Sequence, residues 1–423
     1  MIVENGRPSC VPIVMSADEN YAPFLGVTLY SVLKNANTEC LYDFTILHSE
    51  LSDESMYRLR EMFDTASRGK HARLSFVNIS DYANLEDHES LHLSIATVYR
   101  LFIPEILPQY EKTLYLDCDI VVLDDVSKLL EYKIGDSTIA AARDLLNVAQ
   151  ERYYEENVRV SPKNALNAGV LVINHKRFLE EEIRKRGIQL LEEDWRREKK
   201  RYLYMDNDIL NILCEGSVYY LPMEWNLQWW GLFPPETGSE QVWENNREYQ
   251  AALKDPKIIH YSSAQKPWSR PELRLAIEFW KYAKETAFYE EILMSGQGGQ
   301  QKTQSKQNPF TRFVFPFKRI AQNSEVVIYG AGEVGKAFVQ QNRITDYCKI
   351  VLWVDRNCEK LNNEGYPVSA IERIVSTSYD YVVIAVESET TAGHIKGDLV
   401  GVGVPEDRIV WQPYSVKAVD ECG

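Results

Sequence analysis

Two aspartates, Asp117 and Asp119, stand two positions apart at the end of an apolar run in EKTLYLDCDIVVLDDVSKL, residues 111–129. Carboxylates at this spacing can share one divalent cation where the backbone turns. Mg²⁺ and Mn²⁺ are the hard ions that carboxylate and phosphate oxygens bind. The other interpretation is a solvated acidic turn. The apolar neighbours favour the cation, because they predict a buried strand in which unpaired charge is costly.

Alternating strand and helix patterns precede this motif. VPIVMSA at 11–17, DFTILH at 43–48 and LSFVNI at 74–79 are typical of buried strands, and apolar residues at helical spacing occupy 23–36 and 52–63. This alternation predicts an α/β fold with a mainly parallel sheet. Because ligands of such sheets bind beyond the carboxyl ends of the strands, the residues directly after the first strand are candidates for a binding site.

Length and composition indicate a soluble globular protein of two to three domains. The chain has 423 residues, of which 45% are hydrophobic and 26% are charged. Its formal net charge of −15 disfavours a general nucleic-acid binder, which needs a basic surface to neutralise phosphates. We therefore expect no nucleic-acid partner.

The cysteines and the apolar segments indicate the compartment. Seven cysteines occur without a CxxC pair or zinc-like spacing, which is typical of free thiols in a reducing cytosol. The first residues, MIVENGRPSC, lack the basic and apolar regions of a signal peptide, and no apolar run approaches the roughly 20 residues that cross a bilayer. We expect a cytoplasmic protein, either free in the cytoplasm or at the inner face of the membrane.

A polar run, SGQGGQQKTQSKQNP, begins at Ser295 and is typical of a linker. We expect domains at 1–294 and 323–423, joined by a basic and aromatic linker at 295–322. Within the linker, NPFTRFVFPFKRI at 308–320 interleaves phenylalanines with Arg and Lys. This segment has two interpretations, docking on an anionic membrane or packing at the entrance to the second domain.

The second domain begins with a glycine pattern. Gly330, Gly332 and Gly335 form GxGxxG after the strand EVVIY, and Asp355 ends the next strand. In this context the pattern predicts a Rossmann-like fold with a phosphate site at a helix N-terminus. The alternative is that the glycines serve only helix–strand packing. No YxxxK pair follows, so we expect nucleotide binding or scaffolding here rather than hydride transfer.

Six blocks of the first domain together carry a family resemblance: VPIVMSADENYAPFLGVTLYSVL, SIATVYRLFIPEIL, LYLDCDIVV, LNAGVLVIN, MDNDILN and IIHYSSAQKPW. Over about residues 11–290 the chain resembles glycosyltransferase family eight. The resemblance implies a GT-A fold and retaining transfer of galactose or glucose from a UDP-hexose, with Mn²⁺ or Mg²⁺ as cofactor. It also implies a saccharide or lipid-linked acceptor in bacterial cell-surface glycan biosynthesis, such as that of lipopolysaccharide.

The resemblance also implies roles for particular residues. The metal ligands would be Asp117, Asp119 and His260, and the diphosphate would contact Arg100 and Lys266. The nucleotide pocket would comprise Ser16, Ala17, Asp18, Asn20 and Tyr21, with helix capping by Asp18 or Asn20 as the structural alternative. The sugar pocket would comprise Asn167, Ala168, Gly169 and Asp206 together with the catalytic candidates Asp144, Asn207 and Asp208, of which Asp208 is the candidate nucleophile.

Two positions depart from the family pattern. Ser263 stands where glycine is more frequent, close to the expected phosphates, and Asn207 replaces a glutamine found in several relatives. In addition, Trp229 and Trp230 could form an acceptor platform or pack a loop over the sheet. Two other functions stay open at this point: an NAD(P)-dependent or nucleotide-sugar-modifying enzyme acting in the second domain, and a binding protein with a degenerate site.

Overall fold

The structure is a computed structural model. It describes residues 3–4, 7–8, 10–81, 96–145, 148–198, 201–229, 247–262, 266–270, 275–295, 313, 315–363 and 366–412. Contacts divide the chain into two compact units. The first comprises residues 1–264 and 285–288, and the second comprises residues 265–284 and 289–423.

A seven-stranded sheet forms the centre of the first unit, in the order β10-β8-β9-β6-β3-β4-β5. All neighbouring pairs are parallel except those of β9, which is antiparallel to β6 and β8. The predicted parallel-dominated α/β sheet is thus confirmed. The strands are β3 (Cys10–Ser16), β4 (Leu41–His48), β5 (His71–Asn78), β6 (Lys112–Leu116), β8 (Ile139–Arg143), β9 (Leu166–Asn174) and β10 (Val218–Leu221).

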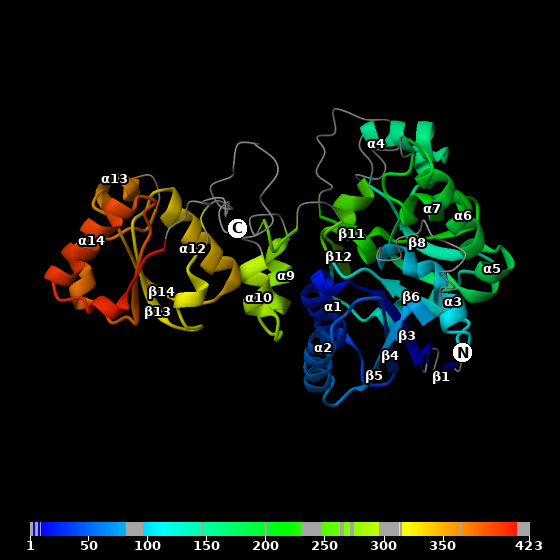
Figure 1. Cartoon of the computed structure of the whole chain (residues 1–423), viewed down its shortest axis with the longest axis horizontal. Helices are drawn as coiled ribbons and strands as arrows, with labels where there is room; N and C mark the ends of the chain where they lie inside the picture. The colour runs from blue at the N-terminus through cyan, green and yellow to red at the C-terminus, as the bar shows by residue number, and fades with distance from the viewer. Residues whose placement is uncertain are drawn as a thin grey trace, which may run out of the picture. The chain divides into compact units, whose positions relative to one another are not determined.

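Helices cover this sheet, with α1 and α2 on one side of β3–β5 and α5–α7 on the other side of the unit (Figure 1). Ser52 caps α2 by accepting a hydrogen bond from the backbone N–H of Ser55, and a proline lies in the first turn of α1. The helices are α1 (Ala22–Asn35), α2 (Asp53–Ala66), α3 (Ile103–Ile106), α4 (Val148–Tyr153), α5 (His175–Glu180), α6 (Ile183–Trp195) and α7 (Asp206–Leu213).

A second, three-stranded sheet in this unit has the order β11-β12-β7. Its strands are β11 (Leu227–Gln228), β12 (Ile258–His260) and β7 (Ile120–Val122). β12 runs antiparallel to β7 in a register that pairs His260 with Ile120. The apolar run around the two aspartates is therefore divided between two sheets, with β6 before the aspartates and β7 after them. A short hairpin of β1 (Val3–Glu4) and β2 (Arg7–Pro8) precedes both sheets.

The second unit contains a four-stranded, all-parallel sheet in the order β14-β13-β15-β16. The strands are β13 (Glu325–Tyr329), β14 (Lys349–Val354), β15 (Tyr381–Ile384) and β16 (Ile409–Val410). The helices are α9 (Ala276–Ala283), α10 (Tyr289–Ser295), α12 (Glu333–Thr345), α13 (Cys358–Asn363) and α14 (Glu389–Gly401).

The division into units differs from the predicted domain boundary at 294. α9 and α10 belong to the second unit, because Trp280 and Tyr289 stack edge to face and Tyr289 packs beside Tyr347. The Tyr289 hydroxyl also donates a hydrogen bond to the carbonyl of Thr345 at the end of α12. The contacts of Tyr289 with Tyr347 and Thr345 join residues more than 50 positions apart, and a composition shift along the chain does not report them.

The basic and aromatic segment packs into the second unit over its described part. Phe313, Phe315 and Phe317 are buried, and the Phe315 ring contacts Phe317 and Phe338. These three side chains therefore pack inside the second unit, as the second interpretation predicts, and are not exposed to a membrane. Phe310 and Arg312 lie outside the described residues.

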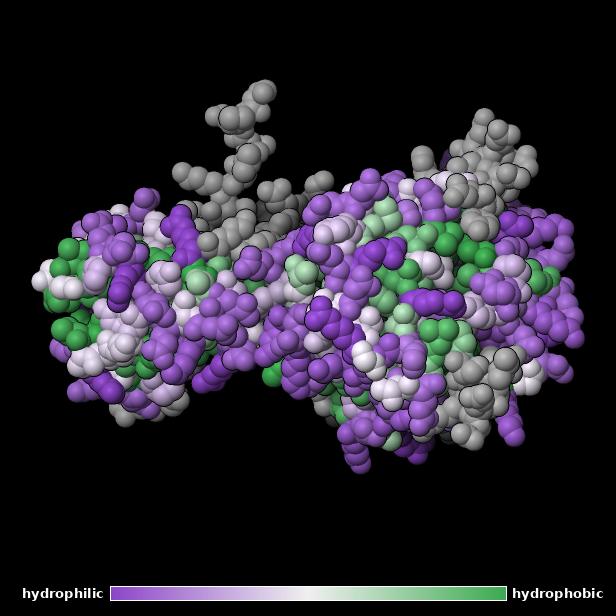
Figure 2. Space-filling model, turned by 90° about the horizontal axis from the view of Figure 1, so that it is seen from below, coloured by the Kyte–Doolittle hydropathy of each residue, from purple (hydrophilic) through white to green (hydrophobic). Residues whose placement is uncertain are grey.

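The face shown in Figure 2 is mostly hydrophilic, with smaller apolar areas between the polar side chains. None of the helices within the described ranges has the length and apolar character needed to span a membrane.

Candidate metal centre and sugar-donor site

Three candidate ligands converge where the two sheets of the first unit meet. Asp117 follows the last residue of β6, and Asp119 precedes β7. The antiparallel pairing of β12 with β7 then brings His260 beside the two aspartates, although it lies 143 and 141 positions after them in the sequence.

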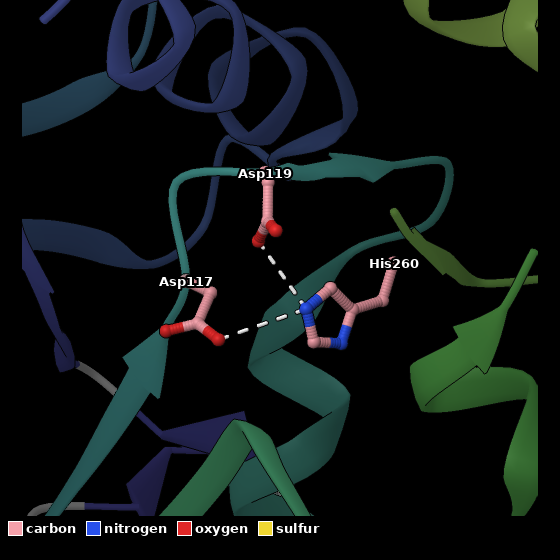
Figure 3. Close-up of side chains that lie close together, drawn as sticks. All are labelled: Asp117, Asp119 and His260. Atoms are coloured by element: carbon pink, nitrogen blue, oxygen red, sulfur yellow. Dashed lines mark ion pairs between the residues drawn. The ribbon is translucent and has the colours of Figure 1, made fainter. Parts of the chain in front are cut away.

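The three side chains face one another (Figure 3). His260 Nε2 lies 3.2 Å from Asp119 Oδ1 and 3.6 Å from Asp117 Oδ2. One ligand atom from each residue falls within 4.8 Å of the others, and His260 is buried. The predicted ligand set is therefore assembled within a single small volume.

The chemistry of these donors fits a divalent cation. His260 Nδ1 lies 2.9 Å from Asn226 Oδ1, an atom that can only accept, so Nδ1 carries the proton. In the neutral ring Nε2 then offers a lone pair toward two carboxylates. A positive charge must lie between these groups, and oxygen and imidazole ligands suit Mn²⁺ or Mg²⁺.

Helix α1 holds the turn that carries the aspartates. The Thr28 hydroxyl lies 3.0 Å from the carbonyl oxygen of Cys118 and 2.9 Å from that of Ile120. The Cys118 thiol donates to the carbonyl of Ser16 at the end of β3. The backbone between the two aspartates is thus tied to α1 and β3.

Arg100 is buried and forms ion pairs with two carboxylates. Its guanidinium lies 2.8 Å from Asp117 Oδ1 and 3.0 Å from Asp206 Oδ2, and it donates to the carbonyl of Ala168. Burial alone would lower the pKa of Arg100, but the two carboxylates raise it above its ordinary value. Because the Tyr115 hydroxyl also donates to Asp117 Oδ1, the other oxygen, Oδ2, is the one that faces His260.

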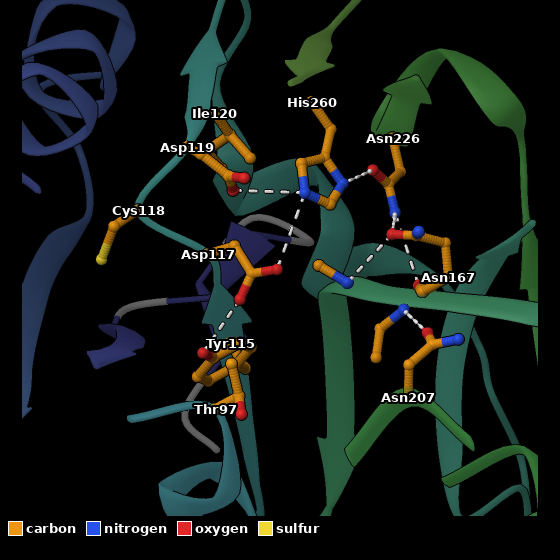
Figure 4. Close-up of polar contacts among 12 residues, drawn as sticks. Thr97, Tyr115, Asp117, Cys118, Asp119, Ile120, Asn167, Asn207, Asn226 and His260 are labelled. Carbon is orange, nitrogen blue, oxygen red and sulfur yellow. Dashed lines mark hydrogen bonds and ion pairs between the residues drawn. The ribbon is translucent and has the colours of Figure 1, made fainter. Parts of the chain in front are cut away.

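Hydrogen bonds connect several of the predicted sugar-pocket residues, of which Figure 4 labels Asn167 and Asn207. Asn167 Nδ2 donates to Asp144 Oδ1 over 3.3 Å. Asn207 accepts from the backbone N–H of Ala168 at 2.9 Å and donates to the Tyr154 hydroxyl, which in turn donates to Asp144. The sequence blocks LNAGV and MDNDILN therefore meet, as the resemblance implies.

Gly169 has no room for a side chain. A Cβ atom at this position would lie 2.2 Å from His260 Cε1 and 3.0 Å from Asp117 Oδ2. Because Gly169 of β9 has no side chain, His260 can lie beside the two aspartates.

Burial raises the pKa of three carboxyls in this region, Asp144, Asp206 and Asp208, to about 6 each. Hydrogen bonds from Asn167 and Tyr154 oppose the shift at Asp144, and the charge of Arg100 opposes it at Asp206. At Asp208 the opposing hydrogen bonds come from the Tyr153 hydroxyl and from the backbone N–H groups of Tyr204 and Leu203. Asp208 is fully buried, and its Oδ1 has no hydrogen-bond partner among the described residues.

A cavity of about 370 Å³ adjoins the aspartates. Four of the five predicted nucleotide residues, Ser16, Ala17, Asp18 and Tyr21, line it, and Asn20 is not among its lining residues. Asp18 also accepts a hydrogen bond from the backbone N–H of Tyr21, which is the capping alternative. The remaining lining residues are Ala96, Thr97, Tyr115, Asp117, Cys118 and Asp119.

Sequence reasoning missed several residues of the site. Tyr115 stands inside the LYLDCD motif, and Thr97 stands inside SIATVYRL, so the motifs already contained both. Asn226 is a fully buried amide in the Trp-rich run MEWNLQWW, of which only Trp229 and Trp230 were predicted to act. Nothing in the sequence pattern singled out Tyr154.

Four further predicted residues are not assigned to this site by the described contacts. Lys266 belongs to the second compact unit, where its Nζ lies 5.9 Å from the centre of the Trp268 ring. Its contact with the diphosphate stays a prediction. Trp229 is half-buried, and its backbone N–H donates to the carbonyl of His260. Ser263 and Trp230 lie outside the described residues.

The glycine pattern of the second unit has a packing explanation at two positions. Gly330 has a φ of +110°, and a Cβ at Gly335 would lie 1.9 Å from the carbonyl oxygen of Gly330. Asp355 accepts hydrogen bonds from the backbone N–H groups of Ala331 and Asn357. Gly332 precedes α12 and would have open space around a Cβ.

Comparisons with known proteins match both units. Residues 12–272 match the family model described as Glycosyl transferase family 8, and residues 322–410 match one described as C2185-like, N-terminal. General stress protein A of Bacillus subtilis is 28% identical over 261 residues, which cover 61% of this chain and 87% of that protein. Lipopolysaccharide 1,2-glucosyltransferase of Escherichia coli K12 is 24% identical over 289 residues, covering 66% and 78%.

The solved structures that resemble the chain include two glycosyltransferases. The galactosyltransferase LgtC in complex with donor and acceptor sugar analogs is 27% identical with a TM-score of 0.55, covering 68% of this chain and all of that one. The bifunctional glycosyltransferase WbbM is 27% identical with a TM-score of 0.59, covering 69% of this chain and 52% of that one.

Proposed function

Since the chain belongs to glycosyltransferase family 8, we propose that it transfers galactose or glucose from a UDP-sugar to a saccharide or lipid-linked glycan. The transfer retains the configuration at the anomeric carbon and depends on Mn²⁺ or Mg²⁺. This proposal rests on the group Asp117, Asp119 and His260, which borders the cavity lined by the predicted nucleotide residues.

The relatives support a hexose donor and a glycan acceptor. One is named a lipopolysaccharide 1,2-glucosyltransferase, and another is a galactosyltransferase crystallised with donor and acceptor sugar analogs. They support a role in cell-surface glycan biosynthesis, in which the acceptor is a saccharide or a lipid-linked glycan. For this role we propose a cytoplasmic location, at the inner face of the membrane where such acceptors are made.

The metal would be held by Asp117, Asp119 and His260. When bound, the ion neutralises negative charge on the diphosphate leaving group. The Arg100 guanidinium lies 2.8 Å from Asp117 Oδ1, so we propose that Arg100 orients this ligand as well as adding positive charge near the diphosphate. Lys266 is proposed to contact the diphosphate directly.

The chain's own polar groups bind and orient the donor. We propose that Asp18 and Tyr21 contact the nucleotide. We also propose that Asp144 accepts hydrogen bonds from the sugar hydroxyls and that Asn167 donates to them. Asn207 is held by the N–H of Ala168 and by Tyr154, which supports a fixed orientation near the anomeric carbon. Such preorganised polar groups stabilise charge that develops in the transition state.

Asp208 has a different environment. Its side chain is fully buried and accepts hydrogen bonds from the Tyr153 hydroxyl and from the backbone N–H groups of Tyr204 and Leu203. This supports a positioning role at the start of α7 over attack on the sugar. Met205, which directly precedes α7, has a φ of +43°, and Asp208 anchors the turn that contains it.

For the second unit we propose a Rossmann-like module that scaffolds or binds a nucleotide. The parallel strand order and the glycine pattern support this fold. The packing reasons for Gly330 and Gly335 give no support to hydride transfer there.

A donor panel tests the proposed activity. The full chain is incubated with UDP-galactose, UDP-glucose and other UDP-sugars with Mn²⁺, and release of UDP is measured with and without EDTA. We expect release from UDP-galactose or UDP-glucose that EDTA abolishes. Asp119→Asn should lower the rate by about 100-fold or more, because a catalytic metal contributes several kcal/mol and 1.36 kcal/mol corresponds to a factor of ten.

The matched control is Asp136→Asn, which changes an exposed aspartate in a turn of the same unit. It should leave UDP release unchanged. Unchanged transfer by Asp119→Ala without added Mn²⁺ would show that the proposed site is wrong.

A further inference from the structure

We propose that Asn226 is a positioning residue for His260. Through a chain of three side-chain hydrogen bonds, Asp144–Asn167–Asn226–His260, it holds the imidazole in the tautomer whose Nε2 faces Asp117 and Asp119. The same chain links this ligand to the proposed sugar pocket. This inference rests on the proposed metal site.

The orientation of each amide follows from a backbone group. The N–H of Gly169 donates to Asn167 Oδ1 at 3.1 Å, so this oxygen is an acceptor. The group of Asn226 that lies 2.9 Å from it must then be the donor Nδ2. Nδ2 also lies 3.4 Å from the backbone carbonyl of Asn167, which again requires a donor.

This orientation turns Asn226 Oδ1 toward His260 Nδ1, 2.9 Å away. Because an amide oxygen only accepts, Nδ1 must be protonated, and the neutral ring then presents a bare Nε2. In Figure 4 Asn226 lies between His260 and Asn167 and contacts both. A ligating histidine needs such a partner on its second nitrogen, which sets both tautomer and ring direction.

The backbone around Asn226 is fixed to the strand that carries the histidine. Asn226 is fully buried and directly precedes β11, whose Gln228 pairs with His260 in parallel register. Two further backbone hydrogen bonds join the two segments. The N–H of Lys257 donates to the carbonyl of Glu224, and the N–H of Trp229 donates to the carbonyl of His260. Asn226 and His260 therefore keep a constant separation without help from a ligand.

At its other end the chain reaches the sugar pocket. Asn167 Nδ2 donates to Asp144 Oδ1, and both residues are proposed to bind sugar hydroxyls. A hydroxyl that binds Asn167 acts on the same amide that orients Asn226. The arrangement thus predicts that Asn226 affects donor-sugar binding as well as metal binding.

The first test measures Mn²⁺ affinity of the full chain in the presence of UDP, by electron paramagnetic resonance of free Mn²⁺. Asn226→Ala should bind Mn²⁺ about 10- to 100-fold more weakly, the usual range for loss of such a partner. Asn226→Asp keeps an acceptor for Nδ1–H and should stay within about threefold of wild type. It removes the donor to Asn167, however, so its KM for the UDP-sugar should rise.

The matched control is Asn174→Ala. Asn174 stands at the far end of β9, where it caps α5 and donates to the Ser137 carbonyl. Its replacement should lower the melting temperature without changing Mn²⁺ affinity. Melting temperatures of all variants without metal show whether each one folds.

A second measurement uses the wild-type chain, so it does not depend on whether a variant folds. ¹⁵N NMR of the histidine rings in the wild-type chain with UDP and Mg²⁺ should show a protonated Nδ1 on His260. A proton on Nε2 in that state, or wild-type Mn²⁺ affinity in a folded Asn226→Ala, would overturn the inference while leaving the proposed function intact. Failure of the wild-type chain to bind Mn²⁺ would overturn both.

Discussion

Gly169 lies on β9 at the point where this strand passes the ligands Asp117 and His260. The space beside its Cα is occupied by the imidazole ring. The ring has no room to move away, because Asn226 holds Nδ1 and the pairing of β12 with β7 holds the backbone. Glycine is therefore required here by a close approach, and its φ is not the reason.

We expect Gly169→Ala to displace His260. Forcing a methyl group into a packed site typically costs about 1–3 kcal/mol, and if the whole cost falls on the metal site, Mn²⁺ affinity drops about 5- to 160-fold. Calorimetric titration of Mn²⁺ with UDP measures this loss. Gly397→Ala in α14, where a Cβ meets nothing within 4 Å, is the control, and it should leave Mn²⁺ affinity unchanged. Equal affinity in both variants would contradict the steric argument.

Asp208 makes stability depend on pH. Burial raises its pKa from 3.8 to about 6, so the native chain binds the proton more tightly than the unfolded chain does. Stability therefore falls as pH rises from about 4 to about 6, by on the order of 3 kcal/mol for this group, and the loss persists above pH 6. Asp208→Asn has no titrating proton and should lack this part of the slope.

Urea unfolding of wild type and Asp208→Asn at pH 4.5, 6.0 and 7.5 measures the difference. The variant should gain stability relative to wild type as pH rises. Asp136→Asn, which changes an exposed side chain, should run parallel to wild type. A constant difference between wild type and Asp208→Asn across this range would contradict a raised pKa.

At the scale of elements, α1 acts as the support of the metal turn. Thr28 is fully buried in α1, and its hydroxyl is shared between two carbonyl groups on either side of Asp119. Ser31, one turn later, accepts a hydrogen bond from the backbone N–H of Val122 in β7. The helix predicted at 23–36 thus has a role that its apolar spacing did not show.

We expect Thr28→Val to loosen this turn. The substitution conserves volume but leaves the two carbonyl groups unsatisfied, at a cost of about 1–3 kcal/mol in the free energy of unfolding. Mn²⁺ affinity should fall as well. Thr45→Val is the matched control, since Thr45 is a buried threonine of β4 that bonds Ser75 instead. If both variants bind Mn²⁺ equally well, α1 does not support the turn.

The pairing of β7 was not predictable from the local sequence. The apolar residues on both sides of Asp117 and Asp119 read as one interrupted strand, and each side has the composition of a buried strand. The structure places β6 in the seven-stranded sheet and β7 beside β12. Which strands pair is set by contacts distant in sequence, and hydrophobic periodicity does not encode them.

At the scale of the whole molecule, each compact unit has its own sheet and core. The chain between residues 295 and 312 carries basic residues and no acidic ones, in a protein of net charge −15. Beyond it, Phe315 and its neighbours belong to the core of the second unit. The hydroxyl of Tyr347 fixes this segment by donating to the carbonyls of Phe317 and Ile320.

Phe315→Ala should therefore act on stability. Removing a buried phenylalanine typically costs about 3–5 kcal/mol, and denaturant unfolding of the full chain should show this loss. Cosedimentation with vesicles of anionic lipid should be unchanged. Val400→Ala, which shortens an exposed side chain of α14, is the control for both measurements. Loss of vesicle binding with normal stability would restore the membrane-docking interpretation.

The sequence by itself determined the chemistry that this protein has available. The spacing of Asp117 and Asp119 indicated a metal, and the alternating apolar runs indicated a parallel sheet, because both are properties of residues close together in the chain. Only the tertiary structure decided which groups meet. The pairing of β12 with β7 places His260 beside the aspartates. The buried Arg100 forms ion pairs with two carboxylates, and Asn226 accepts a hydrogen bond from the histidine ring. These contacts join residues 17 to 143 positions apart, so a local pattern could not report them.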